Sequence, residues 1–259
     1  MAEWKKRSEM RVLGKPTARL DGPIKATGAA KYAYDIFLPG LLQGRIIRCP
    51  HAHATIESID PASIERMPGV KAVIITAKVG DRLVFAGQEI GAVAAATVEQ
   101  VEDAVRALNV KYKVLPHVVH EDKAMVTDAP QVRANQPNVL EKPNVRAAGD
   151  VDTGFRECAA ISIGTYSVAV REHLSLETHG VTCRWDDDTH LTCWASTQGI
   201  FSVRDELAPA LGLKPEDVTV IAEVMGGGFG SKFGAGYEGI NCARLAKKAG
   251  AAVEVAPEA

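Results

Sequence analysis

The clearest hydrophobic pattern lies in the first half of the chain. Residues 90–96 are a short apolar run of small side chains, typical of a buried strand. Thr97 can cap a helix, and Gln100 stands where it would complete a capping box. The apolar positions that follow share one helical face: Val101, Ala104, Val105 and Leu108. Because residues 110–115 then predict the next strand, the β-α-β order predicts a mixed α/β (α+β) fold.

Weaker signals precede this unit. Residues 44–49 and 70–76 predict strands, and residues 61–66 predict a short helix. Residues 14–39 are rich in Gly, Pro, Lys and Asp, so we expect loops around short strands. The first ten residues are polar and predict a loose tail.

The second half predicts strands, a hairpin and two helices. An acidic turn at residues 186–190 separates the two hairpin strands. Gly212 and Gly250 are suited to end the two helices, while Pro209 disturbs the last turn of the first. In chain order these elements are a strand at 161–170, the hairpin strands 181–185 and 191–195, a helix at 202–211, a strand at 218–224 and a helix at 237–249.

Between these two regions the periodicity weakens. Three prolines and three asparagines fall within residues 127–150, a composition typical of a linker. We therefore predict two domains, at residues 11–125 and 151–259, joined by a linker at residues 126–150.

The composition excludes several classes of protein. The 259 residues are 46% hydrophobic and carry a formal net charge of −2, with acidic and basic residues interspersed. No basic face indicates nucleic-acid binding, and no apolar run is as long as a membrane span. The N-terminus lacks the apolar core of a signal peptide, so we expect a cytoplasmic protein.

The five cysteines form no C-x-x-C pair, which argues against a zinc ribbon or an iron–sulfur site within this chain. Their odd number in a cytoplasmic protein predicts free thiols. Cys183 and Cys193 flank the predicted hairpin and could lie close together, either as buried apolar side chains or as a disulfide.

The glycine-rich run Met225-Gly226-Gly227-Gly228-Phe229-Gly230-Ser231-Lys232 is the strongest local motif. Three consecutive glycines let the backbone approach a bulky ligand and turn its N–H groups toward it. The run matches neither the P-loop pattern nor the dinucleotide pattern G-x-G-x-x-G. It therefore predicts either a site for an anionic ligand or a tight turn between two packed elements.

Three other groups carry candidate chemistry. On a strand, His51 and His53 would share one face and could bind a metal; otherwise they are hydrogen-bonded loop histidines. His173, Glu177 and His179 could form a zinc site or an acid/base pair, or Glu177 caps a backbone turn. Gln198, between a strand and a helix, could offer an amide donor and acceptor to a ligand, or is a turn residue.

Several short motifs occur in a fixed order over nearly all of residues 11–250. They are Gly14-Lys15-Pro16, Arg19-Leu20-Asp21-Gly22, Lys25-Ala26-Thr27-Gly28, Ala33-Tyr34-Asp35, Leu38-Pro39-Gly40, Arg48-Cys49-Pro50-His51-Ala52-His53-Ala54, Gly69-Val70-Lys71-Ala72-Val73, Gly87-Gln88-Glu89, His173 to Gly180, Ser196-Thr197-Gln198 and Gly226 to Lys232. This ordered set resembles the N-terminal portion of the large, molybdenum-binding subunit of the xanthine dehydrogenase/aldehyde oxidase family of molybdenum hydroxylases.

The resemblance implies an α/β hammerhead domain followed by the first part of a molybdenum-cofactor-binding domain. It implies a molybdenum–pterin cofactor, either molybdopterin or its dinucleotide, beside Gln198, Gly227, Gly228, Phe229 and Gly230. The family hydroxylates aldehydes or N-heterocycles with water. Its electrons pass to 2Fe-2S clusters and FAD, usually on an iron–sulfur subunit and an FAD subunit.

The chain departs from the family at informative places. The family's large subunit is several times longer, and its base glutamate lies near the far C-terminus, so no catalytic residue and no metal ligand is assigned here. Phe233 follows the loop lysine where xanthine-type enzymes have glutamate, which weakens a purine interpretation. Residues 251–259 form an Ala/Glu-rich tail where the family has a basic strand, which predicts a split or truncated subunit. We expect a partner polypeptide that completes it; the alternatives are a non-catalytic remnant and a protein-binding module.

Overall fold

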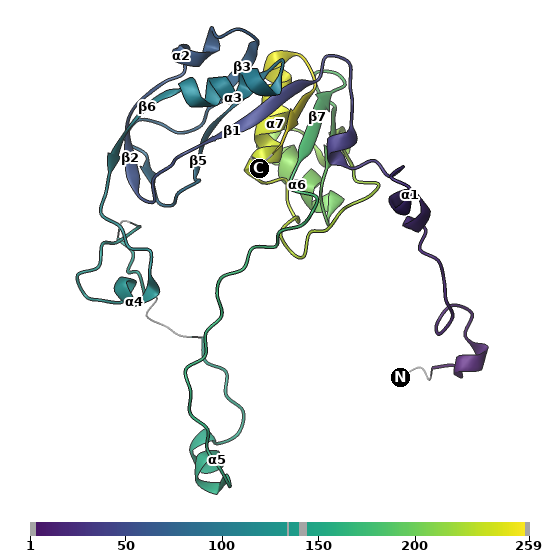
Figure 1. Ribbon diagram of the computed structural model, residues 1–259, viewed down its shortest axis with the longest axis vertical. Coiled ribbons are helices and arrows are strands. Elements are labelled where there is room, and N and C mark those ends of the chain that lie inside the picture. The colour runs from purple at the N-terminus through teal and green to yellow at the C-terminus, as the bar shows by residue number, and fades with distance from the viewer. Residues whose placement is uncertain (1–3, 134, 140–143, 257–259) are drawn as a thin grey trace.

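The computed structural model describes residues 4–133, 135–139 and 144–256, and a seven-stranded mixed sheet runs through both halves of the chain (Figure 1). The strand order is β3-β5-β1-β10-β7-β8-β9, and a smaller sheet has the order β4-β2-β6. The strands are β1 (Leu42–Arg48), β2 (Ala54–Asp60), β3 (Val70–Ile75), β4 (Arg82–Leu83), β5 (Glu89–Ala95), β6 (Asn109–Val114), β7 (Val181–Trp185), β8 (Leu191–Ala195), β9 (Val218–Ile221) and β10 (Val253–Val255).

The helices are short except for three. The longer ones are α3 (Val98–Ala107), α6 (Ile200–Leu211) and α7 (Gly236–Ala249). The shorter ones are α1 (Gly22–Ala26), α2 (Ala62–Glu65), α4 (Glu121–Ala124) and α5 (Val151–Glu157), with 3-10 turns η1 (Arg7–Glu9), η2 (Ala33–Asp35) and η3 (Pro215–Asp217). Among the described residues, none of these helices is long and apolar enough to cross a membrane.

Strand β5 is buried on both faces, as its continuous apolar sequence predicts. Ala92 and Ala94 belong to the core under α7, whereas Val93 and Ala95 belong to the core under α3. Side chains alternate across a strand, so this one strand carries both cores. The mixed α/β fold predicted from this region is confirmed, although β6 joins the smaller sheet rather than pairing beside β5.

Helix α3 begins at the predicted cap, but the capping box is only half formed. The hydroxyl of Thr97 accepts a hydrogen bond from the Gln100 backbone N–H at 3.3 Å. Gln100 does not return the bond; its side chain occupies the space where a Cβ on Gly69 would stand. Its buried Oε1 has no hydrogen-bond partner in the described structure.

The hairpin and the two C-terminal helices form where the sequence predicts them. Cys183 in β7 lies directly opposite Cys193 in β8, and both are buried free thiols. Gly212 and Gly250 follow α6 and α7 with φ angles of 71° and 62°, the left-handed conformation that glycine adopts at low cost.

Three expectations are wrong in detail. Residues 161–170 are extended but pair with no segment that the structure describes, and large apolar side chains there, such as Val168 at 93% exposure, face solvent. The strand expected at 218–224 ends at Ile221. Residues 14–39 contain α1 and η2 rather than short strands, because Pro23 starts a helical turn.

The Ala/Glu-rich tail is also different from the expectation, because its Val-Glu-Val segment is a central strand. β10 pairs in parallel with β1, Leu42 opposite Val253, and antiparallel with β7. Val253 and Val255 enter the core, and Glu254 is 8% exposed. The proposed linker therefore separates segments that contribute neighbouring strands to one sheet, while residues 257–259 lie outside the described structure.

Candidate functional site

The glycine-rich loop connects β9 to α7 and has an unusual backbone. Gly227 and Gly230 have φ angles of 127° and 104°, which side chains rarely permit. Phe229 adopts a φ of 51° although it is neither Gly nor Asn, and its ring is 73% exposed. A bulky residue in the left-handed region is strained, and such strain concentrates at ligand-binding sites.

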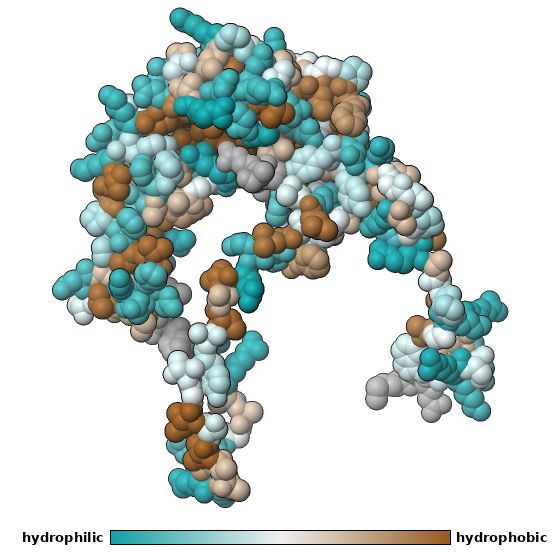
Figure 2. Space-filling model, viewed as in Figure 1, coloured by the Kyte–Doolittle hydropathy of each residue, from teal (hydrophilic) through white to brown (hydrophobic). Residues whose placement is uncertain are grey.

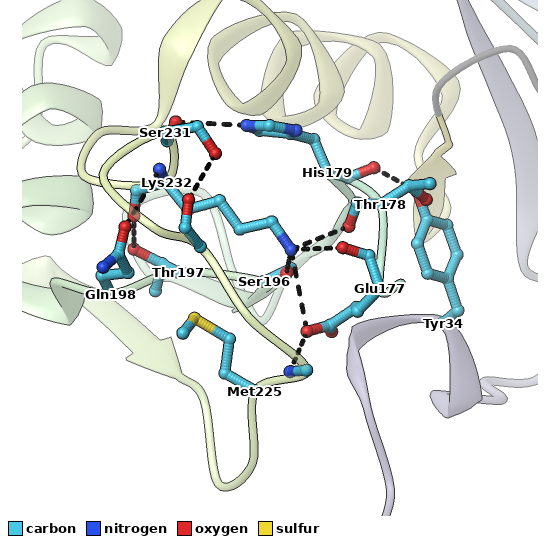
Figure 3. Close-up of polar contacts among 12 residues, drawn as sticks. Tyr34, Glu177, Thr178, His179, Ser196, Thr197, Gln198, Met225, Ser231 and Lys232 are labelled. Atoms are coloured by element: carbon cyan, nitrogen blue, oxygen red, sulfur yellow. Dashed lines mark hydrogen bonds and ion pairs between the residues drawn. The ribbon is translucent and has the colours of Figure 1, made fainter. Parts of the chain in front are cut away.

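Gln198 lies against this loop, as Figure 3 shows. Its side-chain Oε1 accepts the backbone N–H of Gly230 at 2.9 Å and that of Lys232 at 3.4 Å. Its own backbone N–H donates to the Lys232 carbonyl at 2.8 Å. Because the amide oxygen is engaged by the loop, the exposed Nε2 group is left without a partner among the described residues, ready to donate to a ligand.

The middle of the loop carries unpaired backbone donors. The N–H groups of Gly227, Gly228 and Phe229 have no hydrogen-bond partner in the described part of the chain, although Gly228 is buried. A Cβ on Gly228 would lie 2.6 Å from Cδ of Gln198, so only glycine lets the two approach. Successive unpaired N–H groups in such turns form a concave anion-binding nest.

Lys232 ties the loop to two other segments. Its Nζ donates to the carbonyls of Glu177 and Thr178, at 2.6 and 3.2 Å, and to Ser196 Oγ at 2.7 Å (Figure 3). The side chain is fully buried, and this burial lowers the pKa of its amine. A buried ammonium surrounded by oxygen acceptors is a structural anchor.

Glu177 caps a backbone group, as one of the three interpretations of its segment predicts. Its Oε2 accepts the N–H of Gly226 at 2.6 Å and lies 3.8 Å from Lys232 Nζ. His179 contacts the same loop, with Nε2 3.1 Å from the Ser231 carbonyl oxygen. Among the described residues, no group of three His, Cys, Asp or Glu side chains is arranged to hold a metal ion, so the zinc interpretation fails.

His53 is a structural residue. Its Nδ1 lies 2.6 Å from the Pro116 carbonyl, and its Nε2 accepts Arg82 Nε at 2.7 Å. With both ring nitrogens occupied and the side chain buried, the hydrogen-bonded interpretation is the one the geometry supports.

A cavity of about 340 Å³ opens beside the loop. Its wall is formed by the segment around His173, Ser175 and Glu177, together with Ser231. A Cβ on Gly227 would lie 3.7 Å from the Ser175 Cβ, so the loop and this wall are in contact range. The segment His173 to Gly180 therefore shares this cavity with Ser231 of the glycine-rich loop, and Gln198 is joined to the same loop by its hydrogen bond to Gly230.

Comparison with known proteins identifies the family. A model described as "Molybdopterin cofactor-binding domain" matches residues 132–258, and "Aldehyde oxidase and xanthine dehydrogenase, a/b hammerhead domain" matches residues 27–82. The chain belongs to the molybdenum hydroxylase large-subunit family.

Individual members of this family are similar over most of the chain. It is 31% identical over 239 residues to a probable xanthine dehydrogenase subunit of Bacillus subtilis (strain 168), covering 85% of this chain and 32% of that protein. It is 30% identical over 241 residues to the nicotinate dehydrogenase large molybdopterin subunit of Eubacterium barkeri, covering 86% and 56%. The chain thus spans about a third to a half of the length of these curated relatives.

The fold agrees with solved molybdenum hydroxylase structures. The reconstituted CO dehydrogenase from Oligotropha carboxidovorans superposes with a TM-score of 0.80 at 26% identity, covering 95% of this chain and 35% of that one. The predicted order, a hammerhead domain followed by a molybdopterin-binding domain, is confirmed at this level.

Sequence reasoning brought together the glycine-rich loop and Gln198, and the structure places them in contact. It missed the roles of Lys232 and Lys25. The Lys25 amine donates to the Met225 carbonyl at 3.3 Å, across 200 residues of sequence. For Lys232 the available signal was a single lysine in an otherwise uncharged Gly/Phe-rich run, where burial requires oxygen partners.

Proposed function

We propose that this chain forms one wall of the molybdenum–pterin site in a hydroxylase that acts on an aldehyde or N-heterocycle, with water as the source of oxygen. The observation that carries the proposal is the row of unpaired N–H groups at Gly227, Gly228 and Phe229 beside the free Nε2 of Gln198. A pterin-bound molybdenum centre is anionic and rich in oxygen, which is the ligand that such a set of neutral donors suits.

The residues present fit this cofactor. The N–H groups of Gly227, Gly228 and Phe229 would hold its oxygen atoms, and Gln198 would donate from Nε2. Gly226 and Gly228 keep the backbone close to Glu177 and Gln198, since a Cβ at either would lie 2.6 Å from those side chains. When bound, the cofactor supplies a two-electron acceptor for oxidation of the substrate carbon.

The chain's own residues bind and orient rather than transfer protons. Gln198 is held by two loop N–H groups, so its donor keeps one direction without reorganisation. Glu177 is nearly buried, and its Oε2 accepts the Gly226 N–H and lies 3.8 Å from Lys232 Nζ, which fits a structural cap rather than the base. We assign the base to a glutamate outside this chain.

A working enzyme then needs partners. We propose a polypeptide that completes the large subunit, an iron–sulfur subunit with 2Fe-2S clusters and an FAD subunit, assembled in the cytoplasm. The exposed apolar side chains of residues 161–176 support the first of these, because surfaces of this kind are normally covered (Figure 2).

The test is to purify the tagged chain gently from its native host, identify co-purifying proteins by mass, and assay aldehydes and N-heterocycles with an artificial electron acceptor. The proposal predicts a partner that carries the remaining molybdopterin-binding region, and turnover by the complex only. Turnover by the chain alone would refute the assignment of the base. A chain without such a partner and without turnover would favour a remnant or a protein-binding module.

A further inference from the structure

The N-terminal segment from Asp21 to Asp35 reaches the candidate site at two separate points. Lys25 in α1 donates from Nζ to the carbonyl of Met225, the first residue of the glycine-rich loop, at 3.3 Å. Tyr34 in η2 donates from its hydroxyl to the carbonyl of His179. Neither contact is local, because 200 and 145 residues separate the partners.

The Lys25 and Tyr34 hydrogen bonds act on different ends of the glycine-rich loop. Met225 precedes Gly226, whose N–H is held by Glu177. His179 uses its ring Nε2 to contact the carbonyl of Ser231, which is at the far end of the loop. The segment therefore holds the start of the loop directly and its end through His179, while the unpaired N–H groups lie between the two held ends.

Both side chains are themselves fixed in place. Asp21 lies 2.8 Å from Lys25 Nζ, and Arg19 contacts the same carboxylate through two nitrogens at 3.0 and 2.9 Å. This Arg19 contact, with that of Lys25, lowers the pKa of Asp21 to about 2, so the pair stays charged at neutral pH. An anchored amine can hold a carbonyl at lower entropic cost than a free lysine.

Tyr34 is fixed by packing. A Cβ on Gly180 would collide with the Tyr34 ring carbon that bears the hydroxyl, so the ring lies directly on the glycine backbone. Burial raises the pKa of the Tyr34 hydroxyl to about 12, which keeps it protonated and a donor at any physiological pH. Figure 3 shows the ring beside Thr178 and His179, on the side of the site away from Gln198.

We propose that residues 21–35 form a brace for the cofactor site, meaning a segment that holds the glycine-rich loop in position. Lys25 and Tyr34 are its positioning residues, and they fix the places of the two ends of the loop. Neither residue needs to touch the cofactor. The consequence for cofactor binding rests on the proposed function; the positioning of the loop does not.

Hydrogen exchange of the purified chain without added cofactor tests the brace. In a peptide that covers residues 225–232, the amides of Gly226, Gly230 and Ser231 are protected by Glu177, Gln198 and the Gly228 carbonyl. Lys25→Met and Tyr34→Phe should each speed their exchange about fivefold, the effect of one hydrogen bond of ordinary net strength. Lys25→Arg, which can still donate, should restore most of the protection.

Matched controls separate positioning from general stability. Lys31→Met removes an exposed amine from the same segment, and Tyr166→Phe removes an exposed hydroxyl; both should leave the loop unchanged. Gly180→Ala should reproduce Tyr34→Phe, because it displaces the ring without altering the hydroxyl. A peptide from β5 should exchange as in the unaltered chain for every variant.

Two results would overturn the brace: loop exchange unchanged in Lys25→Met and Tyr34→Phe, or equal acceleration in the loop and in β5. Failure of the proposed function is distinguishable, because a native complex without molybdenum would refute that function while leaving the exchange result in place.

Discussion

The side-chain oxygen of Gln198 accepts the backbone N–H of Gly230 at 2.9 Å, so the predicted amide and the predicted loop form one unit. This contact consumes the acceptor of Gln198 and leaves its donor free. The oxygen and the nitrogen of this one amide therefore have different roles, the first toward the loop and the second toward a ligand.

Replacing Gln198 by Glu should separate the two roles. The carboxylate can still accept the loop N–H groups, so stability should change by less than about 1 kcal/mol, while loss of the donor and added negative charge should abolish retention of an anionic cofactor. Gln198→Ala should lose both the contacts with the loop and the donor to the cofactor, and it should lower the free energy of unfolding by about 1 kcal/mol. Chemical denaturation measures the change in stability, and the molybdenum content of the native complex measures retention of the cofactor. Equal molybdenum in Gln198→Glu would contradict the assigned donor role.

Gly228→Ala should disturb the site through steric contact. The new methyl group would meet Gln198 Cδ at 2.6 Å, and displacing that side chain should cost about 1–3 kcal/mol and break the contact to Gly230. Gly154→Ala in α5 is the control, since its Cβ meets no atom within 4 Å and alanine favours a helix, so it should not destabilise the chain. Thermal unfolding checks this; a melting temperature of Gly228→Ala equal to that of the unaltered chain would show that the Gln198 side chain moves aside at no cost.

Lys232→Met should be among the most destabilising changes at the site. It leaves the carbonyls of Glu177 and Thr178 and the Ser196 hydroxyl without their donor, and it unpairs a buried carboxylate. We expect a loss of about 3 kcal/mol in the free energy of unfolding. Lys111→Met, which removes an exposed lysine from β6, should change it by less than about 0.5 kcal/mol. A small loss in Lys232→Met would show that the three segments are held together by other contacts.

The stability of the chain should depend on pH through Glu254. Burial within β10 raises the pKa of this carboxyl above its ordinary value of 4.5. A raised folded-state pKa means that the contribution of Glu254 to stability is present below pH 4.5 and is lost as pH rises through the folded-state pKa. Glu254→Gln should therefore be more stable than the unaltered chain at pH 7, and the difference should shrink as the pH falls toward the ordinary pKa. Urea denaturation at several pH values measures the difference in unfolding free energy between the two proteins. A difference that does not change with pH would exclude titration of Glu254 as its cause.

The sequence predicted the elements whose pattern is local. The apolar run of β5, the Thr97 cap and the glycines after α6 and α7 each act within a few residues, so their signals can be read directly. Gln198 and the loop were brought together by the ordered motifs rather than by periodicity, because nothing local indicates that residues 32 positions apart share a hydrogen bond.

The expectations that failed depend on partners far away in sequence. Residues 161–170 alternate like a strand, but a strand also needs a neighbour, and none of the described segments provides one. Residues 253–255 look like a tail by composition, yet they fill the gap between β1 and β7. Lys25 and Lys232 donate to backbone carbonyl groups, which every residue has. The identity of the accepting residue therefore gives no signal, and sequence patterns could not reveal these contacts.

Whether Gln198 and the glycine-rich loop hold the cofactor is decided by the molybdenum content of the chain purified with its native partners, compared with that of the Gln198→Glu variant. We expect close to one molybdenum per chain in the unaltered complex and a large loss in the variant, with both complexes intact. An unaltered complex that holds no molybdenum, or a variant that retains it fully, would contradict the assignment of Gln198 and the glycine-rich loop to the cofactor.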